Sequence, residues 1–225
     1  MSGRFITFEG GEGAGKSTQI TRLLGRLEDR GIEAIATREP GGSPKAERIR
    51  ESVLAGAAKP FGPLAEALMF SAARIDHLKE TIRPALARGC FVLCDRFSDS
   101  TRAYQGALGK IEPGVMRALE DATIGDTRPD LTLILDVPAE IGLARAAERR
   151  RTAGQGADRF ELEDRSFHER LRQAFLDIAR QEPGRCLVID ASREPDLVEA
   201  DIWRSVAARL LPAVEAVAQA SPAHE

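Results

Sequence analysis

The stretch Gly10-Gly11-Glu12-Gly13-Ala14-Gly15-Lys16-Ser17 fits the pattern G-x-x-x-x-G-K-[ST] at every fixed position. An apolar run at residues 4–9 precedes it, and an amphipathic stretch follows it. Glycines let backbone N–H groups surround phosphate oxygens, and the N-terminus of a following helix adds its unpaired amides. We call residues 10–17 the phosphate loop, and we expect it to bind a nucleoside triphosphate between a strand and a helix.

Two side chains of the phosphate loop have expected roles in phosphate chemistry. Lys16 places a mobile cation near the β- and γ-phosphates, and we expect it to be catalytic. The hydroxyl of Ser17 is a suitable ligand for Mg²⁺, which we predict as the cofactor, with ATP as co-substrate. The expected ATP-binding residues of this region are Gly10, Gly11, Glu12, Gly13, Ala14, Gly15, Lys16, Ser17 and Thr18.

Short apolar runs alternate with amphipathic stretches along the chain. The runs at 4–9, 33–37, 91–95, 131–137 and 186–190 are continuously hydrophobic, which is typical of parallel strands covered on both faces. Helices are expected at 16–29, 46–54, 63–87, 98–105, 114–124, 141–150, 167–180 and 200–218. This order predicts an α/β fold of three layers, of the P-loop NTPase type, with a five-stranded parallel sheet between helices.

No linker rich in proline, glycine or serine divides the sequence, so we expect residues 1–225 to form a single domain. Two segments differ from the rest. Residues from about 149 to 159 begin in a cluster of three arginines and continue into a small, polar, glycine-bearing stretch, which predicts a mobile lid. The tail from about 219 to 225 is expected to be frayed.

The composition is that of a soluble globular protein, with 43% hydrophobic residues, 30% charged residues and a formal net charge of −3. This balance argues against nucleic acid as a partner, and no run reaches the ~20 apolar residues of a membrane-spanning helix. Cys90, Cys94 and Cys186 form no zinc pattern. We expect them to be buried free thiols of a cytoplasmic protein, because no secretion signal is present.

Three classes of protein use such a loop: GTPase switches, motor or assembly ATPases, and small-molecule kinases. The sequence contains no Asn, so the N-K-x-D motif that reads guanine is absent. Motor ATPases usually end an apolar run in Asp-Glu, whereas these runs end in Asp95-Arg96 and Asp136-Val137. Asp95 can instead organise Mg²⁺, and Arg96 can bind a phosphate through two parallel hydrogen bonds.

Arginines at four places, Arg96 among them, supply the positive charge that phosphoryl transfer to an organic acceptor requires. Arg38 follows the second strand, Arg74 lies on a helix, Arg96 follows the third strand, and Arg149, Arg150 and Arg151 precede the expected lid. We expect Arg96 and the three lid arginines to act with Lys16 in catalysis. These features favour a nucleotide kinase.

The sequence resembles the bacterial thymidylate kinases over nearly its whole length. The resemblance depends on several motifs taken together, which are Phe8-Glu9-Gly10, Thr37-Arg38-Glu39-Pro40-Gly41-Gly42, Phe70-Ser71-Ala72-Ala73-Arg74, Asp95-Arg96-Phe97, Ser100-Thr101-Arg102-Ala103-Tyr104-Gln105-Gly106 and Arg128-Pro129-Asp130-Leu131-Thr132. It implies transfer of the γ-phosphoryl group of ATP to dTMP, giving dTDP in dTTP biosynthesis, with Mg²⁺ required and a homodimer as the expected assembly.

The resemblance also implies roles for the residues that would bind dTMP. Arg38 and Arg96 would hold its phosphate, Phe70 would stack on thymine, and Arg74 would hydrogen-bond the carbonyl edge of the base. Ser100 and Gln105 would line the base pocket, and Tyr104 would crowd the 2′ position of the sugar. Glu9 would contact either the 3′-hydroxyl or the waters of magnesium. Ser17 and Asp95 would hold the metal.

The acid in the phosphate loop, Glu12, implies that catalytic positive charge comes from the lid, with Arg149 the first choice. Adenine is expected near the last strand–helix loop, beside Arg193. His77, His168 and His224 match no part of this mechanism and are interpreted as structural or exposed. Two alternatives stay open: another small-molecule kinase, acting on a deoxynucleoside or another nucleoside monophosphate, and a nucleotide-dependent switch or assembly ATPase.

Overall fold

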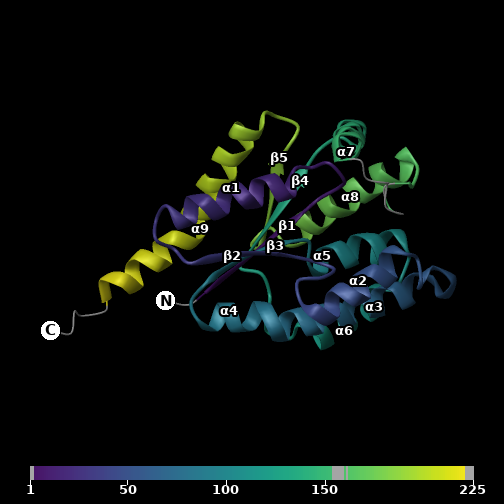
Figure 1. Ribbon diagram of the computed structural model, residues 1–225, viewed down its shortest axis with the longest axis horizontal. Helices are drawn as coiled ribbons and strands as arrows, with labels where there is room; N and C mark the ends of the chain where they lie inside the picture. The colour runs from purple at the N-terminus through teal and green to yellow at the C-terminus, as the bar shows by residue number, and fades with distance from the viewer. Residues whose placement is uncertain (1–2, 154–159, 161, 221–225) are drawn as a thin grey trace.

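Five parallel strands form the centre of the computed structural model, which describes residues 3–153, 160 and 162–220 (Figure 1). Their order across the sheet is β2-β3-β1-β4-β5, so the first strand of the chain is the central one. The predicted α/β fold with a five-stranded parallel sheet is confirmed. The strands are β1 (Arg4–Glu9), β2 (Ala34–Arg38), β3 (Phe91–Asp95), β4 (Leu131–Asp136) and β5 (Cys186–Asp190).

Helices connect the strands close to where the sequence pattern placed them. They are α1 (Lys16–Glu28), α2 (Pro44–Leu54), η1 (Lys59–Phe61), α3 (Gly62–His77), η2 (Leu78–Ile82), α4 (Arg83–Ala87), α5 (Ser98–Thr101), η3 (Arg102–Leu108), α6 (Pro113–Ile124), α7 (Ala139–Ala153), α8 (Arg165–Gln181) and α9 (Pro195–Ala220). The single helix expected at 63–87 is instead divided by the π-helical turn η2. Pro84 explains this division, because it has no N–H to donate to the turn before it.

Along β1, β3 and β4, most side chains on both faces of the sheet are apolar and buried. Ile6 and Phe8 of β1 belong to the core that α1 and α9 complete, whereas Phe5 belongs to the core beneath η2 and α4. Figure 1 shows α1 and α9 on one side of the sheet and α3, α4 and α6 on the other. Burial on both faces is the reason that the strands are continuously hydrophobic in sequence.

The carboxyl ends of β1, β2 and β3 meet at one edge of the sheet. Asp95 at the end of β3 lies in register with Phe8 of β1 and with Arg38 of β2. The chain passes from β1 to one side of the sheet and from β3 to the other, which is the place where open α/β sheets bind ligands. The register therefore brings the phosphate loop, Arg38 and Asp95 to a common edge.

A fully buried carboxyl, that of Glu9, supports the segment that follows β3. One oxygen accepts hydrogen bonds from the backbone N–H groups of Phe97 (2.8 Å) and Ser100 (3.3 Å), and the other accepts from the Ser100 hydroxyl (2.6 Å). Burial, together with the nearby charge of Asp99, raises the pKa of Glu9 from 4.5 to about 7. Glu9 thus fixes α5 and tends to keep a proton near neutral pH.

The predicted lid and the predicted frayed tail extend beyond the residues that the structure describes. Residues 149–153 of the expected lid form the end of α7, and residues 154–159 lie outside the description. In the tail, α9 continues to Ala220, and residues 221–225 lie outside it as well. Among the helices of the described residues, none has both the length and the apolar composition needed to cross a bilayer.

We expect the substitution Glu9→Gln to change how stability depends on pH. Between pH 4.5 and about 7, the Glu9 carboxyl is protonated in the native state and ionised in the unfolded state. The free energy of unfolding of the natural chain therefore falls as pH rises through this window. The variant, which has no such proton, gains relative stability of up to about 3 kcal/mol from pH 5 to pH 8. Urea unfolding at pH 5, 6.5 and 8 measures this difference.

The exposed Glu28 provides the matched control, since Glu28→Gln removes a carboxyl that stays in water in both states. A stability difference between the natural chain and Glu9→Gln that is the same at all three pH values would contradict the raised pKa.

Candidate functional site

A cavity of about 610 Å³ opens at the edge of the sheet where β1, β2 and β3 end. This volume is in the range of small-molecule sites. Most of the residues that the sequence singled out line it: Glu12, Gly13, Ala14, Gly15, Lys16, Ser17, Thr18, Arg38, Phe70, Arg74, Asp95, Arg96, Ser100, Tyr104, Gln105, Arg149 and Arg150. Glu9, Gly10, Gly11, Arg151 and Arg193 were also predicted to belong to the site but do not line it.

The phosphate loop is closed around its own lysine. Nζ of Lys16 donates to the carbonyl oxygens of Gly10 (3.2 Å) and Gly11 (3.0 Å), and the side chain is largely buried. Burial lowers the pKa of Lys16, and repulsion from Arg96 adds to this effect. A buried ammonium group that is held only by carbonyl oxygens would be stabilised by an anion, so the loop is suited to receive a phosphate.

Glycine is required at two positions that shape this loop. Gly15 precedes α1 with a φ of 86°, and Gly13 has a φ of 66°, both in the left-handed region that other residues avoid. A Cβ at Gly13 would overlap the carbonyl oxygen of Gly142 in the first turns of α7. The phosphate loop and α7 therefore touch backbone to backbone.

Ser17 and Asp95 form the oxygen-rich part of the cavity. The Ser17 hydroxyl donates to the Asp95 carboxylate at 2.9 Å, and the two come from adjacent elements, α1 and β3. Hydroxyl and carboxylate oxygens, completed by phosphate oxygens, are the donors that Mg²⁺ prefers. Within the described ranges no group of three or more His, Cys, Asp or Glu side chains forms a metal cage. The donor set thus fits a magnesium ion held jointly by the chain and a nucleotide.

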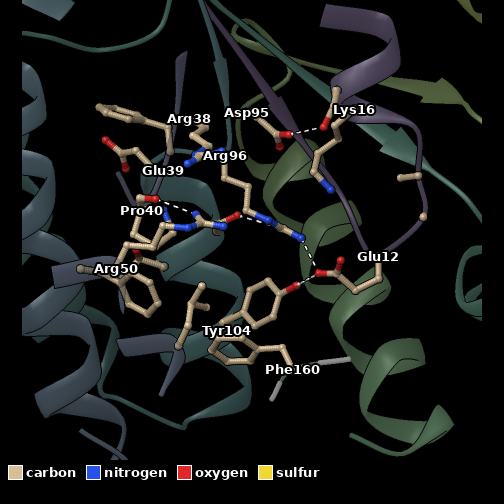
Figure 2. Close-up of a pocket in the computed structure, with 18 of the residues that line it drawn as sticks. Glu12, Lys16, Arg38, Glu39, Pro40, Arg50, Asp95, Arg96, Tyr104 and Phe160 are labelled. Carbon is tan, nitrogen blue, oxygen red and sulfur yellow. Dashed lines mark hydrogen bonds and ion pairs between the residues drawn. The ribbon is translucent and has the colours of Figure 1, made fainter. Parts of the chain in front are cut away.

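Arg96 lies across the middle of the cavity (Figure 2). Its Nη1 donates to the Gly10 carbonyl and to the Ser100 hydroxyl, each at 3.1 Å, and its Nη2 is 2.6 Å from Oε1 of Glu12. Its backbone is left-handed, with a φ of 68°, which is uncommon outside glycine. Such strain at a residue that lines a cavity is typical of functional sites.

Glu12 forms an ion pair with Arg96, and this pairing was not predicted from the sequence. Burial of Glu12 favours its protonated form, but the charges of Arg96 and then Lys16 outweigh burial and lower its pKa to about 2. The Tyr104 hydroxyl also donates to Oε1 of Glu12, at 3.2 Å. Figure 2 shows the side chains of Arg96 and Tyr104 both pointing toward the Glu12 carboxylate. The acid in the loop therefore neutralises a cation of the site.

The other end of the cavity combines an aromatic ring with polar groups. Phe70 and Arg74 come from α3, and Gln105 comes from η3. Nε of Arg74 donates to Oε2 of Glu39 at 2.7 Å, and both side chains are about 95% buried. A ring beside a few fixed donors and acceptors is the arrangement that a planar heterocyclic base requires.

Tyr104 stands in an aromatic cluster beside the phosphate loop. Its ring packs edge-on against Phe160 at 5.1 Å between centroids and lies near Phe167 and Phe175 of α8. The guanidinium of Arg96 lies 5.3 Å from the centre of the same ring. Packing on three sides fixes the position of Tyr104, as a residue that limits the shape of a bound sugar would need.

The other arginines predicted for catalysis, for ATP binding or for the dTMP phosphate occupy different places. Arg149 and Arg150 line the cavity, whereas Arg151 pairs with Glu148 on the exposed surface of α7, at 2.7 Å. Arg193 pairs with Asp201 of α9 and does not reach the cavity. Arg38 is more than half exposed and lies 3.3 Å from Glu47.

Several lining residues were not predicted as site residues, namely Glu39, Pro40, Arg50, Leu54, Phe97, Thr101 and Phe160. Glu39, Pro40 and Thr101 lie inside motifs that the sequence analysis quoted, so their position was visible there although no role was assigned to them. Arg50 donates to the carbonyl of Pro40 at 2.7 Å. Nothing in the local sequence marks Arg50, because its contact depends on how α2 packs.

Comparison with known proteins gives one consistent family. The family model described as thymidylate kinase matches residues 8–202. A thymidylate kinase of a Bradyrhizobium species is 59% identical over 215 residues, which cover 95% of this chain and 94% of that relative. A thymidylate kinase of Nitrobacter hamburgensis is 59% identical over 212 residues, which cover 94% of this chain and 91% of that relative.

A solved structure agrees with these sequence matches. The crystal structure of thymidylate kinase from Ehrlichia chaffeensis superposes with a TM-score of 0.72 at 33% identity, covering 92% of this chain and 99% of that chain. The sequence matches extend from the phosphate loop to α9, and the structural match includes the sheet that positions the cavity. By sequence and by fold, this chain belongs to the thymidylate kinase family.

Proposed function

We propose that this chain transfers the γ-phosphoryl group of ATP to dTMP, giving dTDP and ADP. Membership of the thymidylate kinase family supports this activity. The structural observation that best supports it is a single cavity lined by Lys16 and Ser17 at one end and by Phe70 and Arg74 at the other. Arg96 lines the same cavity, and we place the γ-phosphate of ATP and the phosphate of dTMP beside it.

Catalysis in this proposal depends on positioning and on charge. The acceptor phosphate of dTMP is already anionic at neutral pH, so no side chain has to remove a proton from it. Lys16 and Arg96 would bind the transferred group and the acceptor, and Arg149 and Arg150 would add charge from the end of α7. Arg151, which faces Glu148, is the weaker candidate among the lid arginines. Mg²⁺ held by Ser17 and Asp95 would neutralise charge on the phosphate oxygens.

Two contacts of the structure would be exchanged when substrates bind. Lys16 would leave the carbonyl oxygens of the phosphate loop for phosphate oxygens, and Nη1 of Arg96 would turn from the Gly10 carbonyl to the dTMP phosphate. Arg38, which lines the cavity and is more than half exposed, would bind the same phosphate. For Lys16 and Arg96 the exchange replaces a neutral carbonyl acceptor by an anion, and this favours the bound state.

The base would lie against Phe70, with Arg74 on its carbonyl edge and with Gln105 and Ser100 beside it. Tyr104 would exclude a 2′-hydroxyl. Glu9 would act on this pocket through Ser100, which it holds by two hydrogen bonds, and its expected contact with the sugar or with magnesium waters stays a prediction. The adenine contact expected of Arg193 likewise stays a prediction.

We also propose that two copies of the chain associate through α3 and α6. Leu64, Leu68 and Ile75 of α3 are 44–52% exposed, and Val115 of α6 is 44% exposed. Apolar side chains gathered on neighbouring helices are typical of an interface between copies.

The three free, buried cysteines suit a reducing compartment, so we place the reaction in the cytoplasm.

The activity is tested by supplying the purified chain with ATP, Mg²⁺ and a panel of acceptors: dTMP, dCMP, dGMP, AMP and thymidine. We expect dTDP as the product and a kcat/KM for dTMP at least ~10-fold above that of any other acceptor. Product identity is read by chromatography. A preference for another monophosphate or for thymidine would favour a different kinase, and ATP hydrolysis that needs no acceptor would favour a switch or assembly ATPase.

We expect Lys16→Ala to lower kcat by at least ~100-fold, the scale for losing one essential charge contact with the transferred group. Lys79→Ala, which removes a lysine that is 73% exposed, is the matched control and should keep normal turnover. Circular dichroism verifies that both variants fold. Near-normal turnover of folded Lys16→Ala would remove this lysine from the mechanism.

For the homodimer, we expect light scattering to give twice the chain mass and Leu68→Arg to shift it toward the monomer. A charge buried in an apolar interface has no partner there and costs several kcal/mol. Leu197→Arg places the same charge on an equally exposed leucine of α9 and should leave the mass unchanged. A natural chain that stays monomeric at micromolar concentration would contradict the proposed interface.

A further inference from the structure

A continuous chain of buried hydrogen bonds runs behind the base end of the cavity. It begins at Thr37 near the end of β2, passes through His77 and Glu39, and reaches Arg74. His77 is the last residue of α3 and is fully buried, although it does not line the cavity. In the sequence, His77 matches no part of the expected mechanism.

Both ring nitrogens of His77 have a partner. Nδ1 is 3.1 Å from Oε1 of Glu39, and Nε2 is 2.7 Å from Oγ1 of Thr37. An ionised carboxylate can only accept, so the Nδ1–H group of His77 must donate to Glu39. Nε2 is then able to accept from the Thr37 hydroxyl. The contact with Glu39 therefore places a proton on Nδ1, and the two contacts together fix the orientation of the ring.

Glu39 connects this histidine to the arginine of the site. Its second oxygen, Oε2, accepts from Nε of Arg74 at 2.7 Å, while Nη2 of Arg74 donates to the Thr101 hydroxyl at 3.1 Å. The guanidinium also lies 5.0 Å from the centre of the Phe97 ring. These contacts use Nε and Nη2. Among the described residues Nη1 makes no hydrogen bond, so it is the group that Arg74 can offer to a ligand.

The surroundings leave His77 little room to move. A Cβ at Gly42, which has a φ of 82°, would overlap both Nε2 of His77 and the Thr37 hydroxyl. The carbonyl of Gly42 accepts from the Thr81 hydroxyl at 2.7 Å, which holds this backbone in place. The ring is thus fixed on one side by the loop after β2 and on the other by α3.

We propose that His77 is a positioning residue that sets the direction of the Arg74 guanidinium through Glu39, and that it thereby determines how strongly the site prefers a base with a carbonyl at position 4. This inference rests on the proposed function, in which Arg74 faces the pyrimidine. A donor aimed at position 4 accepts the carbonyl of thymine and rejects the amino group of cytosine, because two donors then face each other.

The physical reason is that a buried carboxylate with one partner removed is free to turn. Glu39 now accepts from opposite sides, from His77 on one oxygen and from Arg74 on the other. Hydrogen bonds to charged groups are among the stronger ones, and loss of the Nδ1 donor leaves the carboxylate partly unsatisfied in a buried place. The guanidinium that it holds would lose its fixed direction.

Two variants of the same residue separate the two nitrogens. The amide of His77→Asn can place its N–H group near the position of Nδ1 and keep the bond to Glu39, whereas His77→Gln reaches toward Thr37 and loses it. We expect His77→Gln to raise the KM for dTMP about tenfold and to lower the ratio of kcat/KM for dTMP over dCMP by a similar factor. The KM for ATP and kcat should stay within about threefold.

His77→Asn should restore the natural KM for dTMP and most of the dTMP preference. Thr37→Val removes only the Nε2 partner and serves as the matched control, with constants expected near those of the natural chain. Equilibrium dTMP binding by calorimetry without ATP gives a readout that does not depend on turnover, and thermal unfolding reports on folding.

Other results would overturn the inference. His77→Gln with an unchanged KM for dTMP and an unchanged dCMP ratio, or equal losses in both His77 variants across kcat and both KM values, would assign His77 a purely structural role. If neither His77 variant folds, Glu39→Gln tests the same link, and an unchanged preference for dTMP refutes it. A natural chain that does not phosphorylate dTMP would instead refute the proposed function.

Discussion

The site depends on one constraint: cations collected at the carboxyl edge of a parallel sheet must be neutralised before any substrate arrives. Lys16 and Arg96 lie in the same cavity, and the positive charge of each disfavours the charged form of the other. Glu12, held ionised by both, neutralises this pair, and the carbonyl oxygens of the phosphate loop accept the remaining N–H groups. The order of the strands matters because it brings these groups to a common edge.

The same principle of internal compensation continues away from the cavity. Glu9 supports the Phe97–Ser100 backbone beneath Arg96, and Asp99 in the same segment is buried against Arg102 and Arg185. These two guanidinium groups lower the pKa of Asp99 in spite of its burial. A buried carboxylate held by two arginines is costly to break but gives a single arrangement. The backbone that presents Arg96 is therefore supported by charge pairs rather than by apolar packing alone.

Much of the fold could be predicted from the sequence. The five strands were predicted at nearly their observed bounds, because continuous apolar runs between glycine-bearing turns have few other interpretations. The π-helical turns η2 and η3 were not predicted. A single missing N–H, such as that of Pro84, changes the hydrogen-bond pattern of a helix without changing its apolar periodicity. Periodicity alone therefore extends a helix through such a turn.

The site was predictable to the extent that motifs mark it. The phosphate loop, Asp95-Arg96 and Phe70 to Arg74 line one cavity, as the motifs indicated. Partnerships across the fold were not predictable: the pairing of Arg96 with Glu12, and that of His77 with Glu39, join residues 84 and 38 positions apart. Residue type showed that such groups need partners but not which partners they find.

The backbone contact between Gly13 and Gly142 has a mechanical consequence. Arg149 lies seven positions after Gly142 in α7. At a rise of 1.5 Å per residue, this length of helix spans about 10 Å. One end of α7 rests on the phosphate loop, and the other end carries Arg149 and Arg150, which line the cavity. The helix therefore ties the distance between these two guanidinium groups and a bound phosphate to the position of the loop that would bind it.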